Sequence, residues 1–173
     1  LYINNGKGNF SKSVAQLPKM YSSKSCVRTA DFNSDGFPDL FVGGRVVPGR
    51  YPESPRSYLL INDGKGNFTD HIKTIAPAFQ QAGMVTDAAW TDLNGDKKPD
   101  LILVGEWMPI TVLINEAGKL VDKTNSYFDK TYSGWWNKLL VDDLNGDGKP
   151  DLVIGNMGLN TQCKASDKEP AEM

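Results

Sequence analysis

Short apolar runs that end at glycine recur along the chain, and each follows a stretch rich in Asp, Asn and Gly. The runs are Leu40-Phe-Val-Gly43, Leu101-Ile-Leu-Val-Gly105 and Leu152-Val-Ile-Gly155. Branched apolar residues in uninterrupted runs of this length are typical of strands that are buried on both faces. The pattern therefore predicts three buried strands, each beginning directly after a polar loop.

A second pattern recurs between these runs and predicts β-hairpins. Leu1-Tyr-Ile-Asn-Asn-Gly-Lys-Gly-Asn-Phe10 is nearly repeated at residues 59–68, and a weaker version occupies residues 112–121. Each copy has an apolar strand, a turn containing glycine and a second strand. The hairpins and the polar loops alternate, so the chain consists of one repeated unit.

Each unit contains four expected strands: one before the polar loop, one after it, and the two strands of a hairpin. Four-stranded antiparallel units at this spacing are typical of β-propeller blades. We therefore expect an all-β chain with an outer hairpin at 1–23, blades at 24–75 and 76–125, and the start of another blade at 126–173. Residues 44–57, with three Pro and two Gly, predict a long surface loop, and residues 76–83 predict a short helical turn.

The number of units is small for a closed propeller. Propellers close with about four to eight blades, whereas this chain contains about three. Open strand edges invite association with other strands. We therefore expect the chain to be a fragment of a longer propeller, or one whose open edges are covered by the remaining blades or by a second chain.

Composition agrees with a globular domain and excludes several classes of function. The chain has 173 residues, of which 39% are hydrophobic and 10% aromatic, with a net charge of −2. No apolar run is long enough to span a membrane, and no basic stripe of the kind that binds nucleic acid is present. The chain begins at Leu without a visible signal peptide, so we expect a mature or excised piece.

The three polar loops, residues 31–39, 92–100 and 143–151, are called the first, second and third Asp loops below. Each carries oxygen-bearing side chains at its first, third, fifth and ninth positions, and a backbone carbonyl at the seventh. Calcium takes about six to eight oxygen ligands, so up to three calcium sites are predicted. The candidate ligands are Asp31, Asn33, Asp35, Phe37 and Asp39, then Asp92, Asn94, Asp96, Lys98 and Asp100, then Asp143, Asn145, Asp147, Lys149 and Asp151.

The alternative interpretation is that these loops are simple turns, because Asn, Asp and Gly favour turns by themselves. Nine of the 21 acidic residues lie in the three loops, and crowded carboxylates repel unless a cation lies among them. An EF-hand is excluded, since the twelfth positions are Val42, Leu103 and Ile154 instead of Glu. Magnesium requires a stricter octahedral geometry than calcium and is disfavoured.

The Asp loops followed by Leu-x-Val-Gly resemble FG-GAP/VCBS repeats, the calcium-loop blades also found in integrin α-subunit propellers, over nearly the whole chain. Residues 83–92, 105–110, 134–137 and 155–160 look like the bacterial secreted proteins grouped with the ASPIC/UnbV and cartilage acidic protein family. The resemblance implies a seven- or eight-bladed propeller, calcium in the blade loops, and a role in adhesion or recognition. It also implies a secreted, periplasmic or cell-surface location.

The second Asp loop departs from the pattern at its sixth position, where Lys97 replaces the glycine found at Gly36 and Gly148. This position favours φ > 0, which is unfavourable for a residue with a Cβ atom. Lys97 also places a positive charge near the expected ion. The second site is therefore predicted to be the weakest of the three.

Other residues allow two interpretations each. Trp90 is expected in the core, whereas Trp107 and the pair Trp135-Trp136 either pack between blades or face a sugar ligand. Cys26 and Cys163 either form a disulfide or remain free thiols. For the long loop we favour a solvated surface over a partner contact; its candidate contact residues are Arg45, Arg50, Tyr51 and Arg56.

Two classes of function remain. The first is a calcium-binding, non-catalytic propeller module that recognises a protein or glycan on one loop face. The alternative is an accessory or catalytic part of a secreted polysaccharide-processing enzyme. The first is favoured because the sequence contains no Ser-His-Asp, P-loop or zinc signature.

Overall fold

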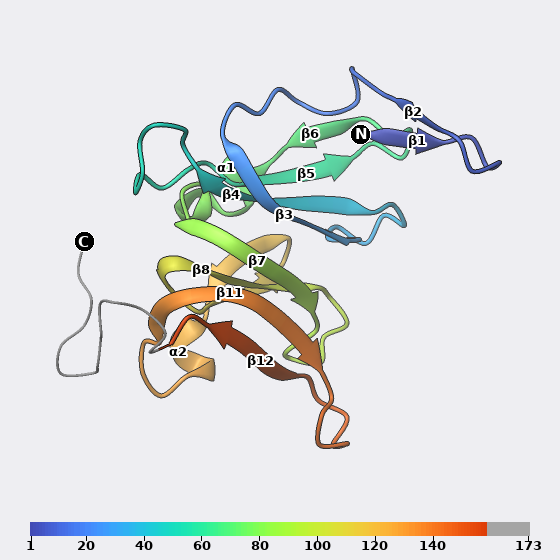
Figure 1. Ribbon diagram of the computed structural model, residues 1–173. Coiled ribbons are helices and arrows are strands. Elements are labelled where there is room, and N and C mark those ends of the chain that lie inside the picture. The colour runs from blue at the N-terminus through green and yellow to red at the C-terminus, as the bar shows by residue number, and fades with distance from the viewer. Residues whose placement is uncertain (159–173) are drawn as a thin grey trace.

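The computed structural model describes residues 1–158, and almost all of their regular structure is β-sheet (Figure 1). Short helical turns are confined to connections. The elements in chain order are β1 (Tyr2–Asn4), β2 (Phe10–Lys12), β3 (Ser23–Ala30), β4 (Asp39–Val46), β5 (Tyr58–Asn62), β6 (Phe68–Asp70), α1 (Ile72–Ile75), η1 (Pro77–Phe79), β7 (Met84–Thr91), β8 (Asp100–Pro109), β9 (Thr111–Glu116), β10 (Lys119–Asp122), α2 (Thr124–Tyr127), β11 (Ser133–Asp142) and β12 (Asp151–Asn156).

The predicted four-stranded unit is confirmed in the first sheet, which has the strand order β3-β4-β5-β6. All three neighbouring pairs in this sheet are antiparallel. The preceding hairpin β1–β2 forms a separate two-stranded sheet. The long loop predicted at residues 44–57 begins within β4 and continues to β5, so its first residues are strand rather than loop.

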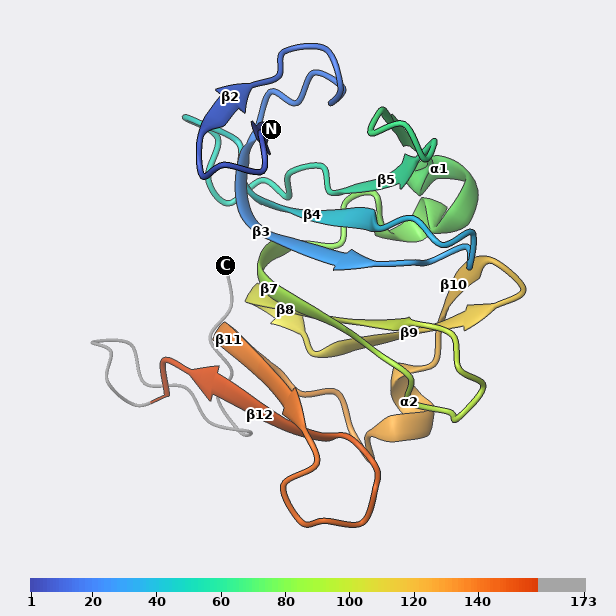
Figure 2. The same cartoon turned by 90° about the vertical axis from the view of Figure 1, so that its right-hand side faces the viewer.

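The second sheet repeats this order as β7-β8-β9-β10, and β11 and β12 form a third antiparallel pair. Figure 2 shows the first sheet, the second sheet and the β11–β12 pair stacked one beneath another. The unpredicted feature is that β11 also pairs with the end of β8, through Ser133, Gly134 and Trp135. The second sheet and the β11–β12 pair are therefore joined by backbone hydrogen bonds.

Gly105 and Trp107 explain why the end of β8 can pair with strands on both sides. A Cβ atom at Gly105 would lie 2.3 Å from the carbonyl oxygen of Met84 on β7, so only glycine permits this approach. Two residues later, Trp107 adopts a positive φ of 54°. The chain is redirected there toward β11, which meets Glu106 and Met108.

Strand β8 is buried on both faces, as its unbroken apolar run predicts. Leu101 and Leu103 belong to a core cluster shared with the first sheet, which includes Phe41, Leu59 and Val85. The alternate residues of β8 belong to a different cluster, against which β11 and β12 pack; its buried members are Ile102, Val104 and Ile110. The second sheet thus provides one wall of each of two cores.

The helical connections are short. Residues 76–83, predicted to form a helical turn, contain η1, and α1 directly precedes it. Ile72 of α1 and Ala76 are buried in the core that lies between the first two sheets. The turn of α2 was not predicted from the sequence.

Candidate metal-binding loops

The three Asp loops each connect the first and second strands of a unit, and they lie at the same end of these strands. They join β3 to β4, β7 to β8 and β11 to β12. Figure 1 shows the third Asp loop at the lower right, whereas the loop from residue 47 to 57 lies at the opposite, left-hand end of the strands. The sequence prediction that each Asp loop joins two strands is confirmed.

The first half of each loop is shaped by its own side-chain oxygens. In the third Asp loop, the backbone N–H of Asp147 donates to Asp143 Oδ1 at 3.1 Å and to Asn145 Oδ1 at 2.9 Å. The N–H groups of Gly148 and Lys149 donate to Asp143 Oδ2 and Asp147 Oδ1. The same bonds recur at the equivalent positions of the other two loops. Three separate stretches of sequence therefore specify one loop conformation.

The aspartate at the ninth position has a different task, which the sequence did not reveal. In the second Asp loop, Asp100 accepts hydrogen bonds from the N–H of Leu93 at 2.9 Å and from the N–H of Asn115 at 2.8 Å. Asp39 accepts equivalent bonds from Phe32 and Asn62. Asn62 and Asn115 end or nearly end the third strand of their sheets, so this carboxylate ties the loop to the hairpin.

Burial and neighbouring charges both affect these buried carboxylates. Burial is the largest cause of the raised pKa of Asp100; the N–H groups of Asn115 and Leu93 oppose it, and the carboxylates of Asp96 and Asp92 add to it. Burial likewise raises the pKa of Asp39, with Asp35 adding a smaller contribution. The carboxylates of one loop are thus close enough to repel one another.

The donor chemistry of the loops fits a hard cation, because every candidate side-chain ligand offers oxygen and a cation would offset the mutual repulsion. The placement of the side chains is less complete. Within residues 1–158, no three His, Cys, Asp or Glu side chains are arranged to hold a metal ion. The loop carboxylates instead accept hydrogen bonds from loop N–H groups. The fifteen ligand positions expected from the sequence therefore stay a prediction.

The second Asp loop has the unfavourable backbone that its sequence predicts. Lys97 adopts φ = 66°, whereas the equivalent Gly36 and Gly148 adopt φ = 89° and 79°. Despite this, the N–H of Lys97 donates to Asp92 Oδ2 at 2.8 Å, as the equivalent glycines donate to Asp31 and Asp143. The loop conformation is maintained at the expense of backbone strain.

The four tryptophans divide into two groups. Trp90 packs against the core between the first two sheets, and Trp136 packs against the core around Ile102. Trp107 is exposed, and its ring centroid lies 5.3 Å from that of Trp135. The neighbours Trp135 and Trp136 therefore have different surroundings.

Several other residues singled out in the sequence have partners within the chain. Arg45 forms an ion pair with Glu106, Arg50 with Glu53 and Arg56 with Asp70. Cys26 is a buried free thiol whose pKa is raised, chiefly by burial. Its possible disulfide partner Cys163 lies outside the described residues.

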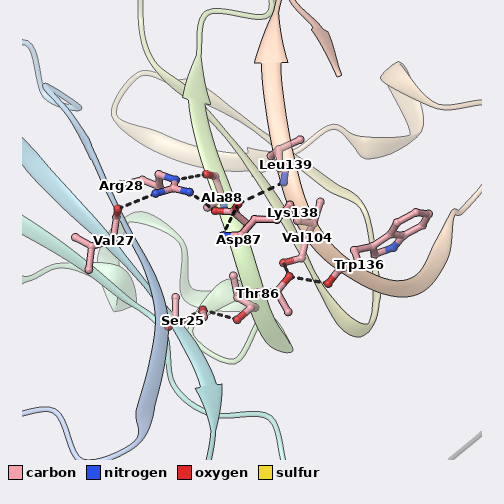
Figure 3. Close-up of polar contacts among 12 residues, drawn as sticks. Ser25, Val27, Arg28, Thr86, Asp87, Ala88, Val104, Trp136, Lys138 and Leu139 are labelled. Atoms are coloured by element: carbon pink, nitrogen blue, oxygen red, sulfur yellow. Dashed lines mark hydrogen bonds and ion pairs between the residues drawn. The ribbon is translucent and has the colours of Figure 1, made fainter. Parts of the chain in front are cut away.

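The sequence analysis missed Asp87, which links three units. Figure 3 shows its carboxylate on β7 between Arg28 of β3 and Lys138 of β11. Asp87 is 1% exposed, forms an ion pair with Arg28, and lies 3.6 Å from the amine of Lys138. The sequence does contain an indication of this role, because Asp87 is the one charged residue in the stretch Met84–Thr91.

Two surface pockets lie beside α2. One is lined by aromatic side chains with Asp129, and the other by polar side chains with Asp122. Each contains a single carboxylate. Neither provides the pair of carboxylates that acid–base hydrolysis of a glycoside requires.

Comparison with known proteins places all three Asp loops inside one family match. The model of the FG-GAP-like repeat matches residues 1–42 and 92–154. Phosphatidylinositol-glycan-specific phospholipase D of Bos taurus is 34% identical over 149 residues, covering 74% of this chain and 18% of that protein. The Mus musculus protein of the same name is 31% identical over 147 residues, covering 74% and 17%. The chain thus spans less than a fifth of these relatives.

The helices in the described part of the chain are short. None of those within residues 1–158 combines the length and the apolar character that crossing a bilayer requires.

Proposed function

The chain belongs to the FG-GAP-like repeat family, and on this premise we propose that it is a calcium-binding, non-catalytic β-propeller module that recognises a protein or glycan outside the cytoplasm. FG-GAP repeats form propeller blades and commonly bind calcium. The observation that carries the proposal is the triplicated Asp loop, whose hydrogen bonds are the same in three units. The narrower likeness to the ASPIC/UnbV and cartilage acidic protein family belongs to this proposal as well.

In each loop, the side chains at the first, third, fifth and ninth positions and the carbonyl at the seventh would hold the ion. Calcium would supply positive charge to a group of mutually repelling carboxylates, and it has no redox role. The chain's own contribution is to fix the loop between two strands through the ninth-position aspartate. The ion therefore has a structural task at the end of the strands, and the opposite end is available for recognition.

Thermal unfolding in chelator, in millimolar calcium and in millimolar magnesium tests the proposal. At ~100-fold excess over Kd, calcium is expected to stabilise the fold by about 2.7 kcal/mol, which corresponds to a rise in Tm of roughly 5–10 °C. Magnesium is expected to produce a much smaller rise.

The matched control is a triple variant with Asp35→Asn, Asp96→Asn and Asp147→Asn, which removes one carboxylate from each loop. We expect it to lose the response to calcium. An equal calcium response in this variant, or no response in the unchanged protein, would contradict the metal sites.

The exposed face of the β11–β12 pair supports a further part of the proposal. Val153 and Leu140 are 50% and 53% exposed, although both belong to apolar strand runs. We propose that further blades or a second chain cover this face and the edge of β12 that has no partner strand within residues 1–158.

A second candidate is that the chain is an accessory segment of a larger enzyme. The observation that favours it is the similarity to two phospholipases D, of which the chain covers less than a fifth. Under this alternative, binding by the chain would increase the activity of a catalytic domain on the same glycan or lipid surface. Release of reducing ends from a glycan, or of phosphatidic acid from a phosphatidylinositol-glycan, by the isolated chain would instead indicate a catalytic site within it.

A further inference from the structure

An aromatic cluster lies at the end of the strands opposite to the Asp loops. It consists of Tyr51 from the long loop, Trp107 near the end of β8 and Trp135 near the start of β11. The indole Nε1–H of Trp107 donates to Tyr51 Oη at 2.8 Å. The ring centroids of Trp107 and Trp135 lie 5.3 Å apart, with the ring planes inclined by 55°. Three consecutive units thus contribute one ring each.

These rings remain accessible, which the packing of the fold does not explain. Trp107 is 37% and Tyr51 50% exposed, and Trp135 is partly exposed. The other two tryptophans, Trp90 and Trp136, pack against cores. Large aromatic side chains contribute most to stability when they are buried, so these accessible rings are available to a ligand.

The backbone of Trp107 is strained, and it holds the ring within the cluster. Its φ of 54° is unfavourable for a residue with a bulky side chain. Strained residues of this kind concentrate at ligand sites, where the surrounding structure maintains them. Here Trp107 lies where β8 turns from β7 toward β11, and its indole meets both Tyr51 and Trp135.

The charged groups beside the rings are already paired. Glu106 on β8 lies opposite Trp135 on β11. Arg45 donates to the buried carboxylate of Glu106. This hydrogen bond is the main cause of the raised pKa of Arg45, to which neighbouring Tyr51 also contributes. Arg50 pairs with Glu53 at 2.6 Å. Within residues 1–158, these four charged side chains are paired with one another, which favours a neutral ligand over a charged one.

We propose that Tyr51, Trp107 and Trp135 form a stacking site for neutral pyranose sugars of an oligosaccharide. Aromatic faces carry partial negative charge, which attracts the C–H groups on the face of a pyranose ring. The hydroxyl of Tyr51, which accepts from Trp107, retains its own O–H for a sugar oxygen. This assignment rests on the recognition function proposed above and gives its ligand a chemical class.

The main competing ligand is a proline-rich peptide, which also docks on aromatic grooves. Such a peptide has a free carbonyl oxygen at each turn that needs a donor at the groove. The indole N–H of Trp107 is the natural donor here, and it is already used by Tyr51. The O–H of Tyr51 remains a donor that either ligand can use, so the peptide probe in the titration below decides between the two.

The test is titration of the calcium-loaded chain with neutral hexasaccharides built from glucose, mannose, galactose or xylose, monitored by calorimetry and tryptophan fluorescence. A hexasaccharide of uronic acids and a proline-rich peptide are included as competing probes. We expect saturable binding of at least one neutral probe. Trp107→Gly and Trp135→Ala are each expected to weaken it by roughly tenfold or more.

Trp107→Gly is suited to this test because it removes the ring and the backbone strain together, so the variant should remain folded. Its matched control is Ala117→Gly, since Ala117 has a similar φ of 51° in the β9–β10 turn and contributes no ring. Thermal unfolding of both variants shows that any loss of binding is not a loss of structure. Ala117→Gly should bind the neutral probe as the unchanged chain does.

Three outcomes would overturn the assignment. No binding of a neutral probe at millimolar concentration, or binding of only the uronic-acid or peptide probe, would exclude a neutral-sugar site. Binding of a neutral probe that is unchanged in both ring variants would place the sugar elsewhere and leave the recognition function intact. The effect of calcium on thermal unfolding is measured without a sugar, so it tests the metal sites independently of the sugar site.

Discussion

The second sheet and the β11–β12 pair carry the same loop and nearly the same strand sequence, yet their surroundings differ. Asp100 and Ile102 are 0% exposed, whereas Asp151 is partly exposed and the equivalent Val153 is 50% exposed. Asp100 receives backbone donors from both its loop and β9. Within residues 1–158, Asp151 accepts a backbone hydrogen bond from Leu144 of its own loop.

This difference separates what a repeat encodes by itself from what its neighbours add. The hydrogen bonds within the second and third Asp loops are the same, so the loop conformation needs no third strand. Burial of the following strand does depend on neighbours. Ile102 is covered because β11 and β12 pack against its side of β8, and Val153 has no equivalent cover within residues 1–158.

The largest effect should come from truncating the equivalent apolar residues. Ile102→Ala removes buried methyl groups from the core beside β11 and should lower the free energy of unfolding by about 3 kcal/mol. Val153→Ala should change it by about 0.5 kcal/mol or less, because the side chain is half exposed. Urea unfolding measures both. A similar loss in the two variants would show that the face of Val153 is covered in solution.

The ninth-position aspartates should show a smaller contrast. Asp100→Asn replaces one carboxylate oxygen by an NH2 group, so one of the two buried backbone N–H donors loses its acceptor. This should lower the free energy of unfolding by about 2 kcal/mol. The substitution also removes the cost of burying a charged carboxylate, which is the main cause of the raised pKa of Asp100. This gain limits the loss. Asp151→Asn should lower it by about 1 kcal/mol or less.

Both aspartate variants should be unfolded in chelator, so that ion binding does not contribute. Equal losses would mean that the bond from Asn115 adds nothing to the stability of the second sheet. A larger loss for Asp151→Asn would reverse the comparison.

The sixth loop position should give the smallest effect and one of opposite sign. Lys97→Gly should raise the free energy of unfolding by about 1 kcal/mol, because glycine adopts φ = 66° without strain. Gly148→Ala should lower it by about the same amount. A Cβ at Gly148 would meet nothing within 4 Å, so backbone strain alone is measured. No gain from Lys97→Gly in chelator would show that the loop does not strain that residue.

Much of the fold could be predicted from the sequence, because the informative patterns are local. Strand β8 followed from the unbroken apolar run Leu101–Val104, and the hairpin β5–β6 followed from Asn62 and the glycines of its turn. The strained position of Lys97 was predicted from its two glycine equivalents and is confirmed by its φ. The repeat made each of these predictions checkable against another copy.

The remaining features depend on contacts between distant segments, which periodicity does not specify. Pairing of β11 with β8 requires the close approach at Gly105 and the turn at Trp107. Asp87 is one residue in an apolar strand, and its partners lie 59 and 51 residues away in the sequence. The ninth-position aspartate was interpreted as a ligand, and its bond to the third strand became visible only in three dimensions.

The bond between Asp100 and Asn115 has a consequence for how such chains change over evolutionary time. Both partners belong to one unit, so a duplication that copies the whole unit also copies the hydrogen bond between its loop and its hairpin. Asp87 sets a different condition, since its basic partners lie in the preceding and the following units. A unit inserted at either of these two junctions would therefore have to present a basic side chain to Asp87, or leave its buried carboxylate with one partner fewer.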